Sequence, residues 1–174
     1  MSNRVPPTIF LTGATGAIGS RVLEDYLVRG SDVYVLARGR DGVSAEDRIR
    51  LLLEQAKLPA ELRRHAHVLE GSIEEPDFGL SRADRHRVIG ATDFFIHSAA
   101  VTHLGATADE CHRSNVLGTR YALELAEACR REGRLQRFGY LSSYAASGTA
   151  RSAFLAEDTL PAHPHFANHY ERTK

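Results

Sequence analysis

Short apolar runs alternate with stretches of helical periodicity along most of this chain. The apolar runs are rich in β-branched and aromatic residues, which favour strands, and glycine, proline or polar residues separate them from the next segment. We expect strands at residues 8–11, 32–37, 67–70, 93–97 and 137–141. Helices are expected at residues 22–28, 44–56, 59–64, 81–89, 108–132 and 167–174.

This alternation predicts a three-layer α/β/α Rossmann fold with a parallel sheet. The strand order is expected to be 3-2-1-4-5, with right-handed crossovers and a ligand crevice across the carboxyl ends of strands 1 and 4. Residues 1–174 are expected to form one dinucleotide-binding domain that is incomplete at its C-terminus. Thr149 to Phe166, with Pro161 and Pro164, is predicted to be a polar loop.

The long helical stretch contains one residue that its pattern does not explain. Asn115 is a poor choice inside a helix, because its amide competes for backbone hydrogen bonds. It has either a polar role near the floor of the active site or a place on the surface. The buried side chains of this helix are expected to include Val116, Tyr121, Leu123, Leu125 and Ala126.

Three glycines follow the first strand in the run Thr-Gly-Ala-Thr-Gly-Ala-Ile-Gly, from Thr12 to Gly19. In a strand, turn and helix context, one glycine allows a tight turn, one lets backbone approach a pyrophosphate, and one lets the helix pack closely. The free N–H groups of the helix N-terminus favour the phosphates. The motif therefore predicts a dinucleotide site, the alternative being a plain glycine-rich turn.

The end of the second strand bears on the choice of dinucleotide. A carboxylate there would bind the 2′-hydroxyl of NAD, but the sequence has Ala37 followed by Arg38. A guanidinium suits a 2′-phosphate instead, so we expect NADPH rather than NADH. Arg48 is placed to reach the same phosphate. Alternatively, Arg38 and Arg40 are solvated loop charges and Arg48 a surface residue.

Other strand ends supply further candidate contacts. Ser72 and Ile73 follow the third strand, where they are placed to hold the adenine. Ala99 and Ala100 follow the fourth strand, and their small side chains would let the nicotinamide ribose lie against the backbone, although core packing also selects alanine. We expect His97 to be a packing residue rather than an acid or base.

The final helix carries the candidate chemistry. Tyr170 and Lys174 lie four residues apart and so share a helix face. A phenol titrates near 10, and a neighbouring ammonium brings its pKa toward the working range. Ser143, at the end of the fifth strand, can hydrogen-bond a substrate oxygen. Without this context, Tyr170 and Lys174 would be an exposed aromatic and cation pair.

Together these motifs resemble the extended short-chain dehydrogenase/reductase superfamily. Within it the chain is most similar to the reductase domains of carboxylic acid reductases, thioester-releasing synthetase termini and fatty acyl-CoA reductases. The matching segments are Thr12–Gly19, Leu36–Arg38 with Arg48, Gly71–Ile73, Phe78–Ser81, His97–Val101, Asn115–Thr119, Leu141–Ser143 and Tyr170–Lys174.

The resemblance implies a role for each matched position. It implies that Ser143, Tyr170 and Lys174 are catalytic, that Arg38 and Arg48 bind the 2′-phosphate, and that Asn115 supports the site. The remaining implied cofactor contacts are Gly13, Thr15, Gly16, Ala17, Ile18, Gly19, Ser72, Ile73, Ala99, Ala100, Val101, Tyr170 and Lys174. At position 72 the family usually has Asp, so weaker adenine selection is expected from Ser72.

Enzymes of this kind continue well past the Tyr-x-x-x-Lys helix, with a C-terminal region that forms the substrate pocket. The chain is therefore expected to be a fragment of a longer reductase, or a short protein that has lost substrate binding. Alone it is expected to bind cofactor weakly and turn over little. Its exposed fifth strand is expected to favour association with a second copy or with the rest of a larger chain.

The composition of the chain bears on its partners, its location and its possible metal sites. The 22 basic and 22 acidic residues balance, so nothing directs the chain to nucleic acid or an anionic membrane. Without a membrane-spanning run or a signal-peptide pattern, a cytoplasmic protein is expected. Cys111 and Cys129 are expected to be reduced and structural, and no metal site is expected, since His163 and His165 more often belong to a loop.

The leading hypothesis is thus an NADPH-dependent reductase of a carbonyl or acyl thioester, presented as a small molecule or on a carrier. An NAD-dependent nucleotide-sugar epimerase or dehydratase shares most motifs, but Ala37 and Arg38 argue against it. A non-catalytic dinucleotide sensor is a third interpretation. The Ser143, Tyr170 and Lys174 set argues against a sensor, and the missing C-terminal region argues for one.

Overall fold

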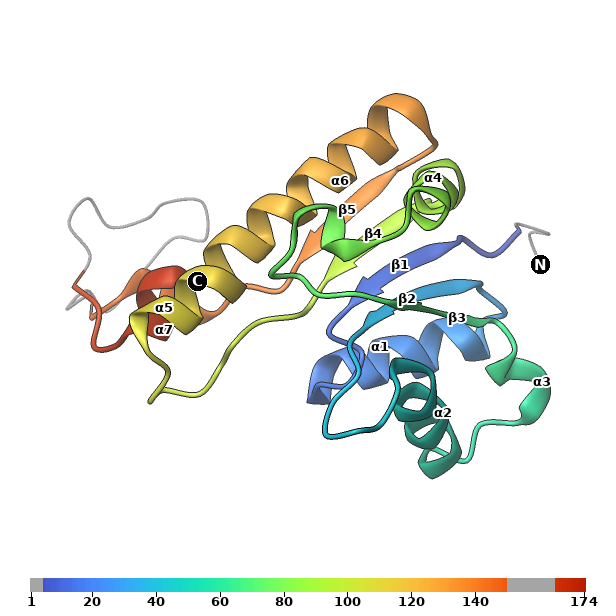
Figure 1. Cartoon of the computed structure of the whole chain (residues 1–174), viewed down its shortest axis with the longest axis horizontal. Coiled ribbons are helices and arrows are strands. Elements are labelled where there is room, and N and C mark those ends of the chain that lie inside the picture. Colours follow the sequence, from blue (N-terminus) through green and yellow to red (C-terminus); the bar gives the residue numbers. More distant parts are fainter. Residues whose placement is uncertain (1–4, 150–164) are drawn as a thin grey trace.

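A five-stranded parallel sheet in the order β3-β2-β1-β4-β5 forms the centre of the computed structural model, which describes residues 5–149 and 165–174 (Figure 1). All four strand pairings are parallel. The strands are β1 (Ile9–Thr12), β2 (Val33–Ala37), β3 (Ala66–Glu70), β4 (Phe94–His97) and β5 (Arg137–Tyr140). The predicted fold class and strand order are confirmed.

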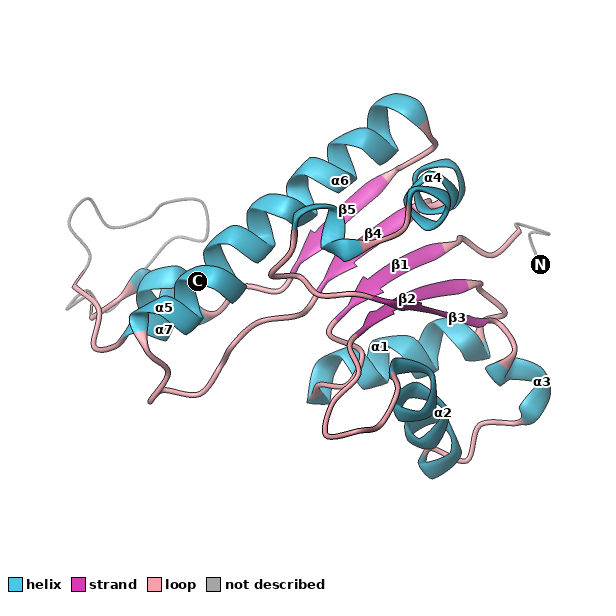
Figure 2. Ribbon diagram, viewed as in Figure 1, coloured by secondary structure: helices cyan, strands magenta, loops and turns pink. Residues whose placement is uncertain are grey.

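Helices cover both faces of the sheet (Figure 2). Helices α1 and α2 lie on one face, while α4 and α6 lie on the other. The α-helices are α1 (Ala17–Val28), α2 (Ala45–Gln55), α3 (Ala60–Arg63), α4 (Arg82–Ala91), α5 (Ala108–Cys111), α6 (Gly118–Glu132) and α7 (His169–Thr173). Short helical segments are η1 (Pro76–Gly79), η2 (His112–Leu117) and η3 (Tyr144–Ser147).

The sheet divides the core into two halves because successive strand residues point to opposite faces. In β1, Ile9 and Leu11 pack on the side of α1 and α2, whereas Phe10 packs on the side of α4 and α6. All three are fully buried. A strand buried on both faces needs apolar residues throughout, which is the pattern that the sequence shows.

A left-handed turn fixes the loop between β3 and α4. Asp77 and Phe78 have φ angles of 49° and 59°, unusual for residues other than glycine. The Phe78 ring is fully buried, with its centroid 6.0 Å from that of Phe10 and 6.4 Å from that of Phe95. The burial of this ring offsets the strain of the turn. The sequence pattern predicts a plain loop here, whereas the structure has a short helical turn anchored in the core.

The predicted long helix from residue 108 to 132 is three consecutive segments. A capping box between Thr107 and Glu110 starts α5, and the π-helical turn η2 joins it to α6. The expected burial of Val116 and Leu123 is wrong, since they are 39% and 51% exposed. The widened turn changes the phase at Val116. The buried positions of α6 are Gly118, Ala122, Leu125, Ala126, Ala128 and Cys129, and Leu123 lies off that face.

The structure describes only part of the C-terminal segment for which a loop and a helix are predicted. Most of the polar loop predicted from Thr149 to Phe166, including Pro161, His163 and Pro164, lies outside the described residues. The chain resumes in α7, which begins after Asn168, whose side chain accepts a hydrogen bond from the Glu171 N–H. The short helix α7 contacts α5, η2 and η3, so it lies against the carboxyl end of the sheet.

Candidate active site

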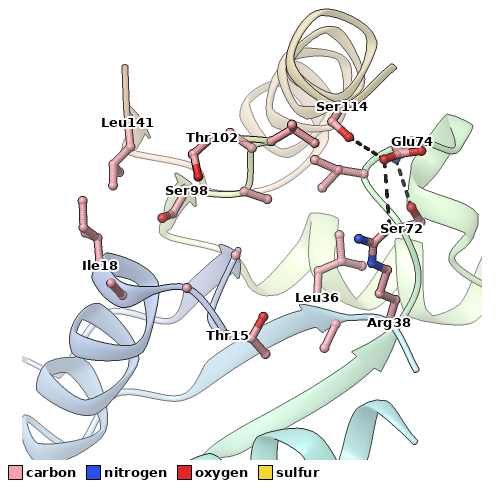
Figure 3. Close-up of a pocket in the computed structure, with 18 of the residues that line it drawn as sticks. Thr15, Ile18, Leu36, Arg38, Ser72, Glu74, Ser98, Thr102, Ser114 and Leu141 are labelled. Atoms are coloured by element: carbon pink, nitrogen blue, oxygen red, sulfur yellow. Dashed lines mark hydrogen bonds and ion pairs between the residues drawn. The ribbon is translucent and has the colours of Figure 1, made fainter. Parts of the chain in front are cut away.

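The carboxyl ends of the five strands meet at one cleft of about 500 Å³ (Figure 3). Each strand contributes the residues that follow it, and α7 closes one end with Tyr170 and Lys174. The other lining residues are Gly13, Thr15, Gly16, Ala17, Ile18, Leu36, Ala37, Arg38, Arg40, Arg48, Gly71, Ser72, Ile73, Glu74, Ser98, Ala99, Ala100, Val101, Thr102, Ser114, Leu141 and Ser142.

Backbone contact at Gly13 sets the shape of the cleft. A Cβ atom at position 13 would lie 2.5 Å from the Ala99 nitrogen and 2.7 Å from the Ser98 carbonyl carbon, and Gly13 has φ of +78°. On the other side, a Cβ atom at Gly19 would lie 2.1 Å from the Gly13 oxygen. Glycine at these two positions lets β1, α1 and the exit of β4 approach one another. Gly19 is therefore the glycine at which α1 packs closely on the turn after β1.

The N-terminus of α1 faces the cleft. Gly16 is its N-cap, and Ala17 and Ile18 line the cleft. No side chain of the described residues caps this end, and the first turn holds no acidic residue. The backbone N–H groups of the first turn are therefore available to an anion, and the helix dipole favours one there.

A buried hydrogen-bond chain lies beneath this junction. The Ala99 N–H donates to the Thr12 hydroxyl over 3.2 Å, and that hydroxyl is 2.8 Å from Nδ1 of His97. Nε2 of His97 lies 3.5 Å from the hydroxyl of Thr119. Burial, and then the charge of Lys174, lower the pKa of His97 from 6.5 to about 4. His97 is therefore a neutral packing residue, as expected, and it ties β1 to β4.

Positive charge gathers at the end of the cleft beside β2. Arg38, Arg40 and Arg48 line it. The guanidinium of Arg48 donates to the carbonyl oxygen of Arg38 over 2.5 Å, which links the helix α2 to the end of β2. Nη1 of Arg38 lies 4.0 Å from a carboxylate oxygen of Glu74. This end of the cleft can hold an anion.

The wall after β3 is set by the loop that Phe78 anchors. The Ser72 N–H donates to the Phe78 carbonyl over 3.0 Å, and the Ser72 hydroxyl accepts from the Glu74 N–H over 3.2 Å. At Gly71, a Cβ atom would lie 2.2 Å from the Phe78 oxygen. Ser72 and Ile73 therefore line the cleft because the buried ring holds the loop behind them.

Asn115 joins two walls of the site from inside the π-helical turn. Its side-chain oxygen accepts from the Val101 N–H over 2.8 Å, and its amide donates to the Val101 carbonyl and the Thr173 hydroxyl, each over 3.0 Å. Only 2% of Asn115 is exposed, so the surface alternative is wrong. The residue connects the loop after β4 to α7, although it does not itself line the cleft.

Lys174 is held against the end of β5. Its Nζ donates to the Leu141 carbonyl over 2.7 Å and lies 4.7 Å from the centre of the Tyr140 ring. Burial lowers the pKa of Lys174, and the neighbouring Tyr170 opposes that shift. The ammonium is therefore fixed beside a half-buried phenol rather than extended into solvent.

The two serines after β5 differ in position. Ser142 lines the cleft and donates to the Lys174 carbonyl over 3.1 Å. Ser143 is not among the lining residues, and its hydroxyl oxygen accepts from the Ala145 N–H over 3.2 Å. The hydrogen of the Ser143 hydroxyl is not used in that bond.

Most of the sequence-predicted site residues come together in this cleft. Of the predicted set, Gly19, Asn115 and Ser143 are not among the lining residues, and the others line the cleft. Glu74, Thr102 and Ser114 line it without having been predicted. Glu74 follows the end of a strand, as Ser72 does, but it belongs to no recognised sequence motif. Thr102 lies in a loop and Ser114 in a helical segment, and the sequence does not predict how either segment is oriented toward the cleft.

Comparison with known proteins agrees with this geometry. Residues 11–174 match the model of an NAD-binding family described as "Male sterility protein". The chain belongs to this family. The L-2-aminoadipate reductase large subunit of Penicillium chrysogenum is 32% identical over 152 residues, which are 80% of this chain and 10% of that protein. A carboxylic acid reductase of Segniliparus rugosus is 31% identical over 159 residues, 84% of this chain and 13% of that enzyme.

Solved structures are also similar to this chain. The terminal R domain from the myxalamid PKS-NRPS biosynthetic pathway superposes with a TM-score of 0.80 at 28% identity, covering 99% of this chain and 44% of that one. A UDP-glucuronic acid 4-epimerase of Bacillus cereus, 22% identical, superposes with a TM-score of 0.65 over 96% of this chain and 48% of its own, which shows the shared fold alone. The resemblance to extended short-chain reductases is confirmed. The chain spans about a tenth of the length of the two enzyme relatives.

Other kinds of site find no support within the part of the chain that is described. No helix there is both long and apolar enough to cross a bilayer. No group of three or more His, Cys, Asp or Glu side chains among the described residues could hold a metal ion. Cys111 and Cys129 are free and buried, and burial raises the pKa of the Cys129 thiol to about 11.

The backbone contact at Gly13 can be tested against a matched glycine. Gly42 has nearly the same φ, +77°, but nothing lies within 4 Å of its added Cβ atom. We expect Gly42→Ala to lower the free energy of unfolding by about 1 kcal/mol, the cost of the left-handed conformation alone. Gly13→Ala should cost about 3 kcal/mol more, because its Cβ atom meets backbone that cannot rotate away. Chemical denaturation measures both, and equal losses would contradict the contact.

The lowered pKa of His97 predicts that the stability of the fold depends on pH. The unfolded chain binds a proton on this histidine near pH 6.5 and the folded chain only near pH 4, so stability falls as the pH drops through that window. We expect this group to lower the free energy of unfolding by about 2 kcal/mol between about pH 7 and pH 5. In His97→Gln that part of the slope should be absent whatever the variant's stability at neutral pH. Denaturation of both proteins across this pH range measures the slope of stability against pH. Equal slopes would refute the assignment of this pH dependence to His97.

Proposed function

We propose that this chain is the dinucleotide-binding and catalytic part of an NADPH-dependent reductase that acts on a carbonyl or acyl thioester. The observation that carries the proposal is the layout of one cleft. Arginines line it beside β2, an uncapped helix N-terminus faces its middle, and Tyr170 and Lys174 close its other end. This is the order in which an extended dinucleotide presents a 2′-phosphate, a pyrophosphate and a nicotinamide.

The residues present fit such a cofactor. Gly13, Gly16 and the first turn of α1 would border the pyrophosphate, and the N–H groups of Ala17 and Ile18 would donate to it, because the Gly16 N–H already donates to the Gly13 carbonyl. Arg38 and Arg48 would hold the 2′-phosphate through charge-assisted hydrogen bonds. Ser72 and Ile73 would border the adenine, and the loop Ala99–Val101 the ribose next to the nicotinamide. When bound, the cofactor supplies the hydride.

The chain's own residues supply the proton and the orientation. Lys174, fixed by the Leu141 carbonyl, holds its ammonium near the phenol of Tyr170 and orients the phenol for proton transfer. Tyr170 then donates its proton to the oxygen of the reduced carbonyl. Ser143 would donate a hydrogen bond to the same oxygen, because its own oxygen accepts from the Ala145 N–H and its hydrogen has no acceptor among the described residues.

The substrate class rests on the relatives. A carboxylic acid reductase and an R domain of a PKS-NRPS pathway support an acyl group delivered as a thioester, including one bound to a carrier. We propose that the reaction takes place in the cytoplasm. The epimerase alternative has only a shared fold at 22% identity in its favour, and the cleft has arginines where an NAD ribose would call for an acid.

The cofactor preference can be tested by removing the arginines singly. We expect Arg38→Ala and Arg48→Ala each to weaken NADPH binding about tenfold and NADH binding by less than about twofold, because only NADPH has the 2′-phosphate. Fluorescence titration of both dinucleotides measures this. Arg29→Ala, which removes an exposed arginine of the same charge outside the cleft, is the control. Equal weakening of NADH would overturn the NADPH assignment.

Tyr170→Phe tests catalysis and separates the enzyme from a dinucleotide sensor. We expect kcat for reduction of an acyl thioester by the full-length reductase to fall by about 10²- to 10⁴-fold, because the proton donor is lost. NADPH affinity should change by less than about twofold. Tyr144→Phe removes a nearby phenol that is 95% exposed and serves as the control. Unchanged turnover in Tyr170→Phe would favour a different acid or a sensing role.

A further inference from the structure

One acidic side chain lies among the positive charges of the cleft. Of the described residues that line it, Glu74 is the only acid, and it stands between the arginines beside β2 and the helical segment η2. Nothing in the proposed function requires a carboxylate at this place. A negative charge beside a site for a phosphate weakens the binding of that phosphate.

Glu74 is held in place by contacts other than the one with Arg38. The Ser114 hydroxyl donates to Oε1 of Glu74 (Figure 3). The Arg113 side chain lies 3.7 Å from Oε2. The backbone N–H of Glu74 donates to the Ser72 hydroxyl. The side chain is 29% exposed. These contacts keep the carboxylate at the cleft wall whether or not Arg38 is near it.

The contact between Glu74 and Arg38 is loose by comparison. Their closest charged atoms are 4.0 Å apart, beyond hydrogen-bond distance, and 64% of the Arg38 side chain is exposed. Arg38 is therefore attracted to Glu74 without being locked by it. A phosphate that binds Arg38 must draw the guanidinium from this carboxylate and approach the carboxylate's charge itself.

We propose that Glu74 is a specificity-determining residue that competes with the ligand's 2′-phosphate for Arg38 and so limits the preference for NADPH over NADH. The proposal rests on the proposed 2′-phosphate site. Removing the charge of Glu74 strengthens NADPH binding, because both the competition and the repulsion disappear. NADH has a neutral 2′-hydroxyl at this position, so its binding is nearly unaffected.

The experiment compares three variants of the full chain by titration with NADPH and NADH. At low ionic strength, Glu74→Gln is expected to tighten NADPH binding about threefold to tenfold and to change NADH binding by less than about twofold. The gain should shrink as salt is raised to about 0.5 M, because exposed charges are screened. A merely structural role for Glu74 would not produce this salt dependence.

Two further variants separate charge from shape. Glu75→Gln makes the same change in net charge at the neighbouring, exposed residue, which does not line the cleft, and should leave both affinities unchanged. Glu74→Asp keeps the charge but shortens the side chain, and should keep the wild-type ratio of the two affinities. A gain in Glu75→Gln equal to that in Glu74→Gln would overturn the proposal, as would a Glu74→Asp variant that behaves like the glutamine.

Failure of this inference is distinguishable from failure of the proposed function. If Arg38→Ala weakens NADPH selectively while Glu74→Gln leaves the ratio of NADPH to NADH affinity unchanged or lowers it, the 2′-phosphate site stands and the role of Glu74 is refuted. If Arg38→Ala affects both dinucleotides equally, or neither binds, the 2′-phosphate site is refuted and the inference with it.

Discussion

The approach of the turn after β1 to the exit of β4 is the contact on which the cleft depends. Gly13 lies against the backbone at Ala99, and the same glycine supports α1 through its oxygen at Gly19. The hydrogen bond that Ala99 donates to Thr12 and the one between Thr12 and His97 hold the two strands together beneath this contact. The two central strands therefore deliver their loops to one point, and the other walls are arranged around it.

The fold and the inner part of the site were predictable because they depend on local patterns. Apolar runs and glycine spacing indicated the strands, the sheet order and the residues at the strand ends, since parallel strands place their carboxyl ends on one edge. The features that sequence patterns could not predict depend on contacts between distant segments. Glu74 lies near Arg38 only because Phe78 inserts into the core and turns its loop, and Phe78 does so at a positive φ that no local pattern predicts.

The two ends of the cleft use charge in different ways. At the β2 end, Arg38 is largely exposed and lies near the carboxylate of Glu74, so ionic strength and small shifts of charge adjust what binds there. At the α7 end, Lys174 is half-buried against a carbonyl oxygen and an aromatic ring, and beneath them His97 stays neutral because it is buried. The first arrangement suits selection among ligands, and the second suits a fixed proton-transfer geometry.

The π-helical turn at residues 112–117 constrains the number of residues that join α5 to α6. A π turn accommodates one more residue than an α turn. Losing a single residue here would leave a regular α-helix with α6 in nearly its present orientation relative to α5, because the widened turn already absorbs the extra residue. The loss would instead remove the widened turn from which Asn115 reaches Val101 and Thr173. In this family of sequences, a one-residue gap in that turn would therefore mark a protein in which the helix that corresponds to α7 is anchored differently.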